Sequence, residues 1–339
     1  MVTLTSEVIA SKSTHTFAAV RFRRLMFRKA PSLFSLTGTN TSPHLRVAVV
    51  TGGNRGIGLE ICRQLASSGV LVVLTARDEE KGSRAVEELH SSGLSDVIFH
   101  QLDVADRSSI TQLAEFVKTK FGKLDILVKN AAIGGTTIDP ERLKELQQQN
   151  PEANMRTFVD GYLARLQQTY ELAKECLDIN FNGTKDVTDC LIPLLLLSNS
   201  GRVVNVSSQI AQLKFISNEG VIKVLSDIET LSEEKLNGVM STFLTDFKAG
   251  DLAARGWLPV ASAYAASKAL VNAYSRLLAR RHPSLVVCCV TPGFVRTGMN
   301  YGMGLVSAAE GARAPVRLAL REEHGDSGLN FELFDVCEF

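Results

Sequence analysis

The chain has 339 residues, of which 45% are hydrophobic and 22% charged, a composition typical of a globular protein and not of a disordered or fibrous one. It holds 37 Lys and Arg against 36 Asp and Glu, so the net charge of +1 gives no reason to expect nucleic acid as a partner. The longest apolar run, residues 191–197, contains Pro193 and falls far short of the ~20 residues that cross a bilayer, so we expect no membrane partner.

The first 45 residues differ in composition from the rest. They contain six basic residues, one acidic residue and thirteen Ser or Thr, which is typical of an organellar transit peptide. A disordered extension and an over-long start of the chain are the alternatives. We expect a cytoplasmic protein, or a plastid or mitochondrial one if residues 1–45 act as a transit peptide, with the folded domain at residues 46–339.

The six cysteines show neither a Cys-x-x-Cys pair nor a cluster with His at the spacing of zinc ligands. Cys288 and Cys289 are adjacent in an apolar run, where neighbouring side chains point to opposite faces of a strand. We therefore expect free thiols, a reducing compartment and no metal site.

Short apolar runs recur along the chain from residue 46 onward. They occupy residues 46–51, 70–75, 97–102, 125–128, 202–206 and 285–290. Because each run is apolar throughout, both of its faces are expected to be covered. Segments with helical spacing, such as residues 59–68 and 79–90, lie between the runs. This alternation predicts an α/β domain with a parallel, doubly wound sheet.

Two segments depart from the alternation. Residues 139–174 are polar with helical spacing, and residues 213–257 carry a helical stripe of apolar residues that begins after Ser232, with Glu233 and Glu234 in its first turn. We interpret both as inserts that cover a site, with surface decoration as the alternative.

A glycine-rich turn follows the first run. Gly52, Gly56 and Gly58, with Arg55 and Ile57 between them, lie between an expected strand and an expected helix. Glycines allow the backbone to approach a ligand, and the free N–H groups of a helix start bind a pyrophosphate. The context predicts a dinucleotide site.

The second run ends at the position that selects the dinucleotide. NAD sites place a carboxylate there for the ribose hydroxyls, whereas this chain has Ala76, and Asp78 comes too late. Arg77 and Arg55 can instead bind a 2′-phosphate by charge-assisted hydrogen bonds. NADP(H) is therefore favoured over NAD(H).

Tyr264 and Lys268 are four residues apart, hence on one face of a helix. A cation near a phenol favours the ionised form and makes the phenol a better proton donor. The pair follows the strand of residues 202–206, whose end leads to Ser207 and Ser208 at the edge where α/β sheets bind ligands.

The ordered motifs resemble the short-chain dehydrogenase/reductase family. They span residues 46 to about 320, and within the family the chain is similar to the monomeric carbonyl reductases, above all to the plant branch of salutaridine, menthone and isopiperitenone reductases. The resemblance implies one Rossmann-type domain with about seven strands and helical inserts. It rests on Thr51–Gly58, Asn130-Ala-Ala, Asn180-Phe-Asn-Gly-Thr184, Ser207-Ser208, Tyr264-x-x-x-Lys268 and Pro292–Thr297.

The resemblance also implies roles for single residues. Tyr264 would be the general acid, Lys268 would bind the nicotinamide ribose and promote proton donation, Ser208 would bind the substrate oxygen, and Asn180 would hold a water. Ser207 receives no role. The expected cofactor contacts are Gly52, Arg55, Gly56, Ile57, Gly58, Arg77, Asp103, Val104, Asn130, Tyr264, Lys268, Val295, Arg296 and Thr297.

One residue departs from the family pattern. Lys129 stands where the family usually has the first of two asparagines, and a buried lysine must find a partner or a route to solvent. The cofactor geometry at this edge is therefore in doubt.

These observations predict an NADPH-dependent reductase of a hydrophobic ketone or aldehyde, of terpenoid or alkaloid-like type. NAD-dependent alcohol oxidation by the same fold and a non-catalytic NADP(H)-binding regulatory module are the alternatives. The second insert lies where dimeric relatives pack together, which predicts a monomer. Apolar residues near the expected site suggest an apolar substrate pocket, although each could equally belong to the core: Ile210, Leu213, Phe215, Met299 and Tyr301.

Overall fold

The apolar runs form neighbouring strands of one sheet in the computed structural model, which describes residues 46–148, 155–321, 325 and 327–339. The N-terminal extension that we interpret as a transit peptide lies outside these residues. The strands follow the order β10-β9-β8-β7-β4-β1-β2-β3. Six of them match the expected runs: β1 (Val47–Val50), β2 (Leu71–Ala76), β3 (Val97–Gln101), β4 (Ile126–Lys129), β7 (Arg202–Val206) and β8 (Val286–Thr291).

The sheet has eight strands among the described residues, one more than expected. Seven are parallel, and β10 (Asp335–Cys337) folds back antiparallel on β9 (Leu329–Glu332). Both of these strands are short and mix polar with apolar residues, so no apolar run marks them in the sequence. The doubly wound α/β fold that we predicted is confirmed.

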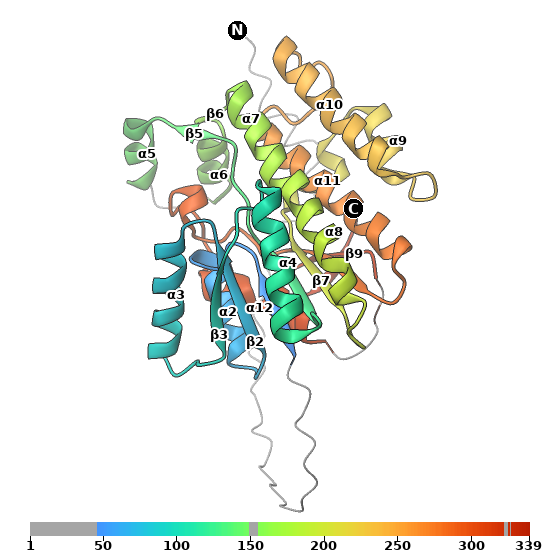
Figure 1. Cartoon of the computed structure of the whole chain (residues 1–339). Helices are drawn as coiled ribbons and strands as arrows, with labels where there is room; N and C mark the ends of the chain where they lie inside the picture. The colour runs from blue at the N-terminus through green and yellow to red at the C-terminus, as the bar shows by residue number, and fades with distance from the viewer. Residues whose placement is uncertain (1–45, 149–154, 322–324, 326) are drawn as a thin grey trace, which may run out of the picture. The chain divides into compact units, whose positions relative to one another are not determined.

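Helices cover both faces of the sheet (Figure 1). One buried cluster joins one face of the sheet to a first set of helices, and a second cluster joins the opposite face to three others. The first set includes α4 (Arg107–Phe121), α8 (Thr184–Leu195) and α11 (Ser262–Arg281). The second set is α2 (Gly56–Ala66), α3 (Glu79–Ser91) and α12 (Ala308–Leu320).

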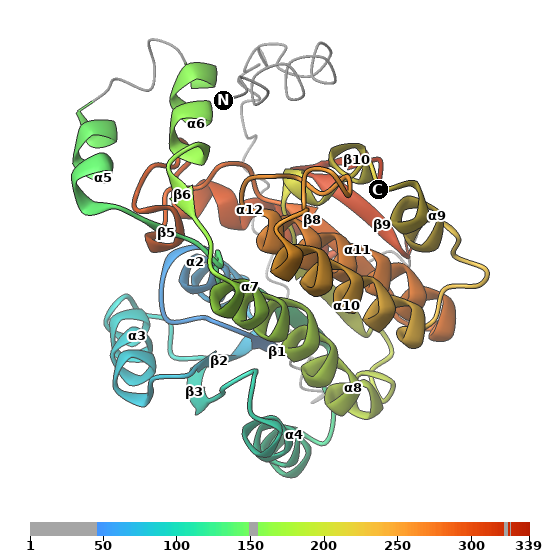
Figure 2. The same ribbon diagram turned by 90° about the horizontal axis from the view of Figure 1, so that it is seen from above.

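The first insert is helical, as its sequence predicted. It contains α5 (Pro140–Gln147) and α6 (Met155–Leu163), flanked by β5 (Thr137–Ile138) and β6 (Leu166–Gln167), which pair with each other (Figure 2). The chain then enters α7 (Tyr170–Leu177), whose last turn widens into the π-helical segment η1 (Asp178–Gly183) before α8.

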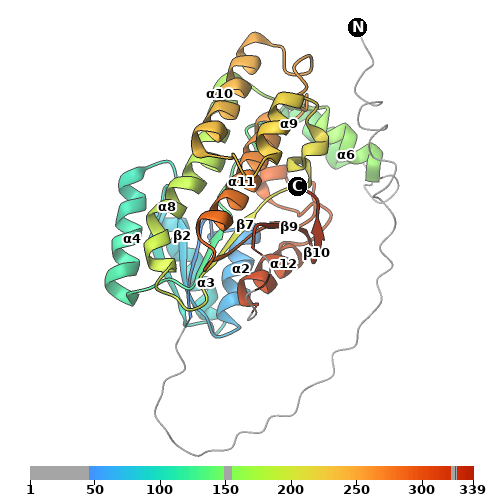
Figure 3. The same cartoon turned by 90° about the vertical axis from the view of Figure 1, so that its right-hand side faces the viewer.

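The second insert forms α9 (Glu219–Ser226) and α10 (Glu233–Ala249), which pack beside α11 (Figure 3). Ser232 caps α10 by accepting a hydrogen bond from the backbone of Lys235, as expected. The stripe on α10 contributes Leu236, Val239 and Phe243 to the first buried cluster. Within the described ranges, no helix is long and apolar enough to cross a membrane.

Candidate active site

The glycine turn after β1 is built for close approach of the backbone to a ligand. Gly52 and Gly56 have φ of +64° and +56°, in the region that favours glycine. A Cβ on Gly58 would lie 2.2 Å from the carbonyl oxygen of Gly52, so α2 can start this close to the turn only with glycine at that position.

The start of α2 keeps its N–H groups free of side-chain caps. Arg55 at the N-cap makes no capping hydrogen bond, whereas side chains cap α3, α4, α5, α7, α9, α10 and α12. Uncapped N–H groups at the positive end of the helix dipole suit an anion. The residues present therefore fit the pyrophosphate of a dinucleotide.

Asn130 holds the glycine turn in place. Its side-chain Nδ2 donates to the carbonyl oxygens of Thr51 at 3.1 Å and Gly52 at 3.0 Å, and its backbone N donates to the Thr51 hydroxyl at 3.0 Å. Asn130, predicted as a cofactor contact, is thus also a support of the phosphate turn.

The adenosine end of the expected site lies at the ends of β2 and β3. Arg77 and Asp103 both line a surface hollow with residues of α7 and η1. The carboxylate of Asp78 is occupied as the cap of α3, where it accepts from the backbone N and the Nζ of Lys81 at 3.0 and 2.7 Å. Arg77 is exposed next to this occupied carboxylate. Val104, beside Asp103, packs against the end of η1.

Tyr264 and Lys268 lie on one face of α11, as expected. The Nζ of Lys268 is 5.8 Å from the centroid of the Tyr264 ring. Burial and the neighbouring Cys176 raise the pKa of Tyr264, and a hydrogen bond with the Ser208 side chain opposes that rise. The structure thus brings Ser208, Tyr264 and Lys268 together.

Lys268 is anchored by the end of β7. Its Nζ donates to the carbonyl oxygen of Val206 at 2.7 Å, and burial lowers its pKa to about 8. Ser207, to which we assigned no role, donates to Asn272 at 2.6 Å and is buried.

Asn180 clamps the chain after β4. Its Oδ1 accepts from the backbone N of Ile133 at 2.9 Å, and its Nδ2 donates to the Ile133 carbonyl oxygen at 2.9 Å and to the Ser267 hydroxyl at 3.0 Å. Ser267 immediately precedes Lys268 on α11. Asn180 therefore ties β4, η1 and α11 together, and η1 is a π-helical turn of a kind often found at functional sites.

The loop after β8 carries the residues expected at the nicotinamide end. Asn300 organises it, because its Oδ1 accepts from the Thr297 backbone N at 3.1 Å and its Nδ2 donates to the Val295 carbonyl oxygen at 2.8 Å. The Arg296 guanidinium donates within the same loop, to the carbonyl oxygen of Gly304. A Cβ on Gly56 would lie 3.5 Å from Thr297, so this loop meets the glycine turn.

Sequence reasoning missed Tyr162, which α6 brings to the site. Its ring lies 6.2 Å from that of Phe294, and burial together with Tyr301 raises its pKa to about 12. Tyr162 also adds to the raised pKa of Tyr264, so the two phenols are neighbours. No local signal marks this residue, because Tyr162 and Tyr264 are 102 positions apart in the sequence. Asn300 could have been found from its position three residues after Thr297, at the spacing of a capping box.

The residues expected in an apolar pocket differ in burial and in location. Leu213 is buried in the main core, and Tyr301 packs with Tyr162 and Phe294 beneath the first insert. Met299 is 40% exposed in the loop after β8. Ile210 and Phe215 are partly buried on the short turns that follow Ser208.

Lys129 is buried at the end of β4 and finds oxygen partners on α8, in the hydroxyl of Thr188 and the carbonyl of Thr184. The buried lysine thus has the partners that the sequence analysis required of it. Across the described parts of the chain, no group of His, Cys, Asp and Glu could hold a metal ion.

Comparisons with known proteins place this geometry in context. A family model described as short chain dehydrogenase matches residues 46–220. The (+)-neomenthol dehydrogenase of Arabidopsis thaliana is 51% identical over 298 residues, covering 87% of this chain and 98% of the relative. The NADPH carbonyl reductase 1 of Homo sapiens is 40% identical over 291 residues, covering 82% and 92%. The solved structure of salutaridine reductase from Papaver somniferum superposes with a TM-score of 0.80 at 48% identity, covering 85% of this chain and 99% of that one.

Proposed function

Since the chain belongs to the short-chain dehydrogenase family, we propose that it is an NADPH-dependent reductase that converts a hydrophobic ketone or aldehyde, of terpenoid or alkaloid type, to an alcohol. The observation that carries the proposal is the meeting of Ser208, Tyr264 and Lys268 at the same sheet edge as the glycine turn.

Each side chain has a task in this reaction. NADPH, when bound, supplies the hydride. Ser208 and Tyr264 donate hydrogen bonds to the carbonyl oxygen, and Tyr264 delivers a proton to that oxygen as negative charge develops on it. Lys268, fixed by the Val206 carbonyl, favours the ionised phenol that remains.

The preference for NADPH follows from the end of β2. Arg77 is exposed there and free to bind a 2′-phosphate, while the nearby Asp78 is already committed to capping α3. Arg55 lies in the glycine turn and is likewise exposed. The NADPH in the name of the human relative agrees with this assignment.

The substrate class is supported by the apolar surroundings of Tyr264. Tyr162, which contributes to the raised pKa of Tyr264, packs in one apolar cluster with Phe294 and Tyr301, and the relatives are named for salutaridine and neomenthol. An apolar surface of this kind suits a cyclic ketone with few polar groups.

The test combines nucleotide titration with turnover. NADPH and NADH are titrated into the protein, and menthone, salutaridine, quinones and aldehydes are then offered as substrates. We expect NADPH to bind more tightly, and Tyr264→Phe to lower kcat by at least about 10²-fold while NADPH affinity is kept. Thr242→Ala, which removes an exposed hydroxyl from α10, is the control and keeps activity. Binding of NADPH without turnover of any carbonyl would favour the non-catalytic module instead.

A further inference from the structure

A row of polar residues crosses the buried face of the sheet behind α11. Lys129 of β4 pairs with Asn205 of β7, which pairs with Cys289 of β8. The Nδ2 of Asn205 and the Sγ of Cys289 both donate to the hydroxyl of Ser275 on α11, at 2.7 and 3.1 Å. The row therefore faces the helix that carries the Tyr–Lys pair.

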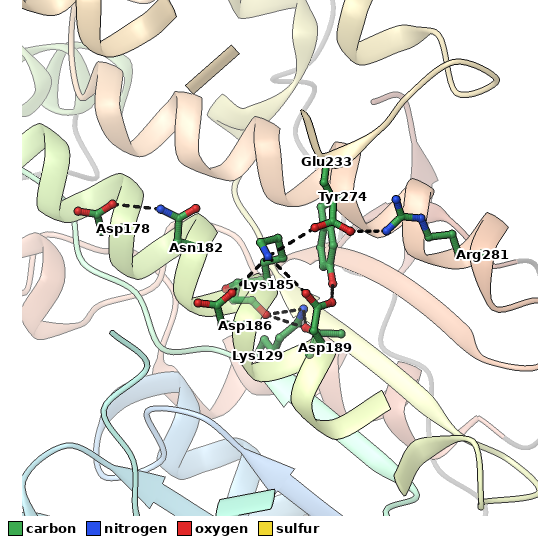
Figure 4. A network of polar contacts seen from close by, with 11 residues as sticks. Lys129, Asp178, Asn182, Lys185, Asp186, Asp189, Glu233, Tyr274 and Arg281 are labelled. Atoms are coloured by element: carbon green, nitrogen blue, oxygen red, sulfur yellow. Dashed lines mark hydrogen bonds and ion pairs between the residues drawn. The ribbon is translucent and has the colours of Figure 1, made fainter. Parts of the chain in front are cut away.

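Three groups around the amine of Lys129 attract a cation and oppose the effect of burial. Its Nζ donates to the Thr184 carbonyl oxygen at 3.4 Å and to the Thr188 hydroxyl, and it lies 5.3 Å from the centroid of the Tyr274 ring (Figure 4). Two oxygen acceptors and the face of an aromatic ring all favour a positive charge.

Tyr274 links this amine to carboxylates nearer the surface. The Tyr274 hydroxyl donates to Asp189 at 2.6 Å, and Lys185 lies 3.4 Å from Asp189 and 3.5 Å from Glu233, which also pairs with Arg281 (Figure 4). The network joins β4, α8, α10 and α11.

Lys129 lies next to three segments that hold or support proposed site residues. Thr184, its acceptor, directly follows η1, which holds Asn180. Asn130, the next residue in the chain, braces the glycine turn. Asn205, its strand neighbour, precedes the Val206 carbonyl that anchors Lys268.

Four titratable groups face Lys129 from the packed elements. Burial keeps Cys289 a neutral thiol, with a pKa raised to about 11, and raises the pKa of Tyr274 well above its ordinary value. Asp189 attracts the ammonium and Lys268 repels it. The effect of burial is larger than that of either charge, and it lowers the pKa of Lys129 to about 7. Burial likewise lowers the pKa of Lys268 to about 8.

We propose that Lys129 is a positioning residue for the reduction, whose buried ammonium joins the Thr184 carbonyl, next to the Asn180 segment, to the Tyr274 ring on α11, the helix that carries Tyr264 and Lys268. When the amine deprotonates, it no longer attracts the carbonyl and the ring as a cation does, so α11 is held less firmly against the Asn180 segment. The proposal rests on the proposed function, because its first readout is carbonyl reduction.

The first test is the pH profile of kcat, with NADPH and menthone, for three forms of the full chain. We expect the wild type to lose about three- to tenfold in kcat as the pH rises through about 7, because α11 then holds the proton donor less well in place. Lys129→Met lacks this step and stays at the lower rate, whereas the change that deprotonation of Lys268 causes near pH 8 is common to all three forms. Lys129→Arg, whose charge is permanent, keeps the higher rate to higher pH. Superimposable profiles of the wild type and Lys129→Met would overturn the proposal.

Lys185→Met is the matched control, because it removes a lysine from the same network on the far side of Asp189. It keeps the step near pH 7 if the step belongs to Lys129. A step lost equally in Lys185→Met would show that the network is only structural.

The second test needs no activity. The folded-state pKa of Lys129 is lowered, so the unfolded chain binds more protons between pH 7 and the ordinary value of 10.5, and this residue destabilises the fold most below pH 7. Lys129→Met is therefore expected to have a higher urea midpoint than the wild type at pH 6, with a gap that shrinks toward pH 10. An inactive wild type would count against the proposed function alone, whereas a gap that does not change with pH would overturn the charge on Lys129.

Discussion

Arg77 and Asp78 are adjacent at the end of β2 and have different tasks. The carboxylate of Asp78 accepts two hydrogen bonds from Lys81, and these bonds lower its pKa and keep it ionised as the cap of α3. Arg77 is exposed at the mouth of the hollow that Asp103 also lines. Asp78 caps α3, whereas the exposed side chain of Arg77 is available for the proposed 2′-phosphate.

Arg77→Ala is expected to raise the KM for NADPH by about 10- to 100-fold, since a charge-assisted hydrogen bond to a phosphate contributes about 1.5–3 kcal/mol. The KM for NADH should stay within about twofold, because NADH lacks the 2′-phosphate. Steady-state kinetics with both nucleotides measure this difference. Arg84→Ala is the control, because Arg84 is an exposed arginine on α3 that pairs with Glu80. Equal losses with the two nucleotides would contradict a phosphate role for Arg77.

At the scale of elements, the turn between β1 and α2 depends on the absence of a side chain at Gly58. The helix begins so close to the preceding turn that the Asn130 amide and the Gly52 carbonyl fill the space a Cβ would need. The same packing presents the uncapped end of α2 to a ligand. The residues that pack α2 against the turn thus also shape the proposed cofactor site.

Gly58→Ala is expected to destabilise the protein by about 1–3 kcal/mol and to weaken NADPH binding at least tenfold, because the added methyl overlaps backbone 2.2 Å away. Urea unfolding and nucleotide titration measure the two effects. The matched control is Gly238→Ala on α10, where a Cβ would meet nothing within 4 Å. This second change removes a helical glycine and should stabilise by about 0.5–1 kcal/mol. Similar behaviour of the two variants would show that the turn is more tolerant than its geometry implies.

At the scale of the folded domain, α9 and α10 lie against α11 and cover its outer side (Figure 3). Their apolar residues complete the main core, with Phe243 and Trp257 in an edge-to-face contact at 5.1 Å. The Trp257 indole also donates to Asp246 at 2.8 Å, which closes the end of the insert onto α10. A face covered in this way no longer offers α11 to a second chain.

The protein is therefore expected to be a monomer. Sedimentation equilibrium should give the mass of a single chain, 36.9 kDa, over a wide range of concentration. A mass that rises to twice this value at micromolar concentration would contradict the covering role of the insert.

Most of the fold and the family follow from the sequence, because continuous apolar runs, glycine turns and the Tyr264–Lys268 spacing are local patterns with local physical causes. The relatives confirm the family and its plant branch. No apolar run predicted the strands β9 and β10, since their pairing depends on an existing sheet edge and not on their own composition.

The tertiary structure alone decided which distant groups meet. Tyr162 and Tyr264 are 102 positions apart in the sequence and neighbours in the fold. Lys129 is likewise surrounded by Thr188, Tyr274 and Lys268. The charge of a buried amine depends on the solvent that is excluded around it and on the groups that fold against it. Neither is encoded at the position of the residue itself, so the sequence could mark Lys129 as unusual but only the fold assigned its partners.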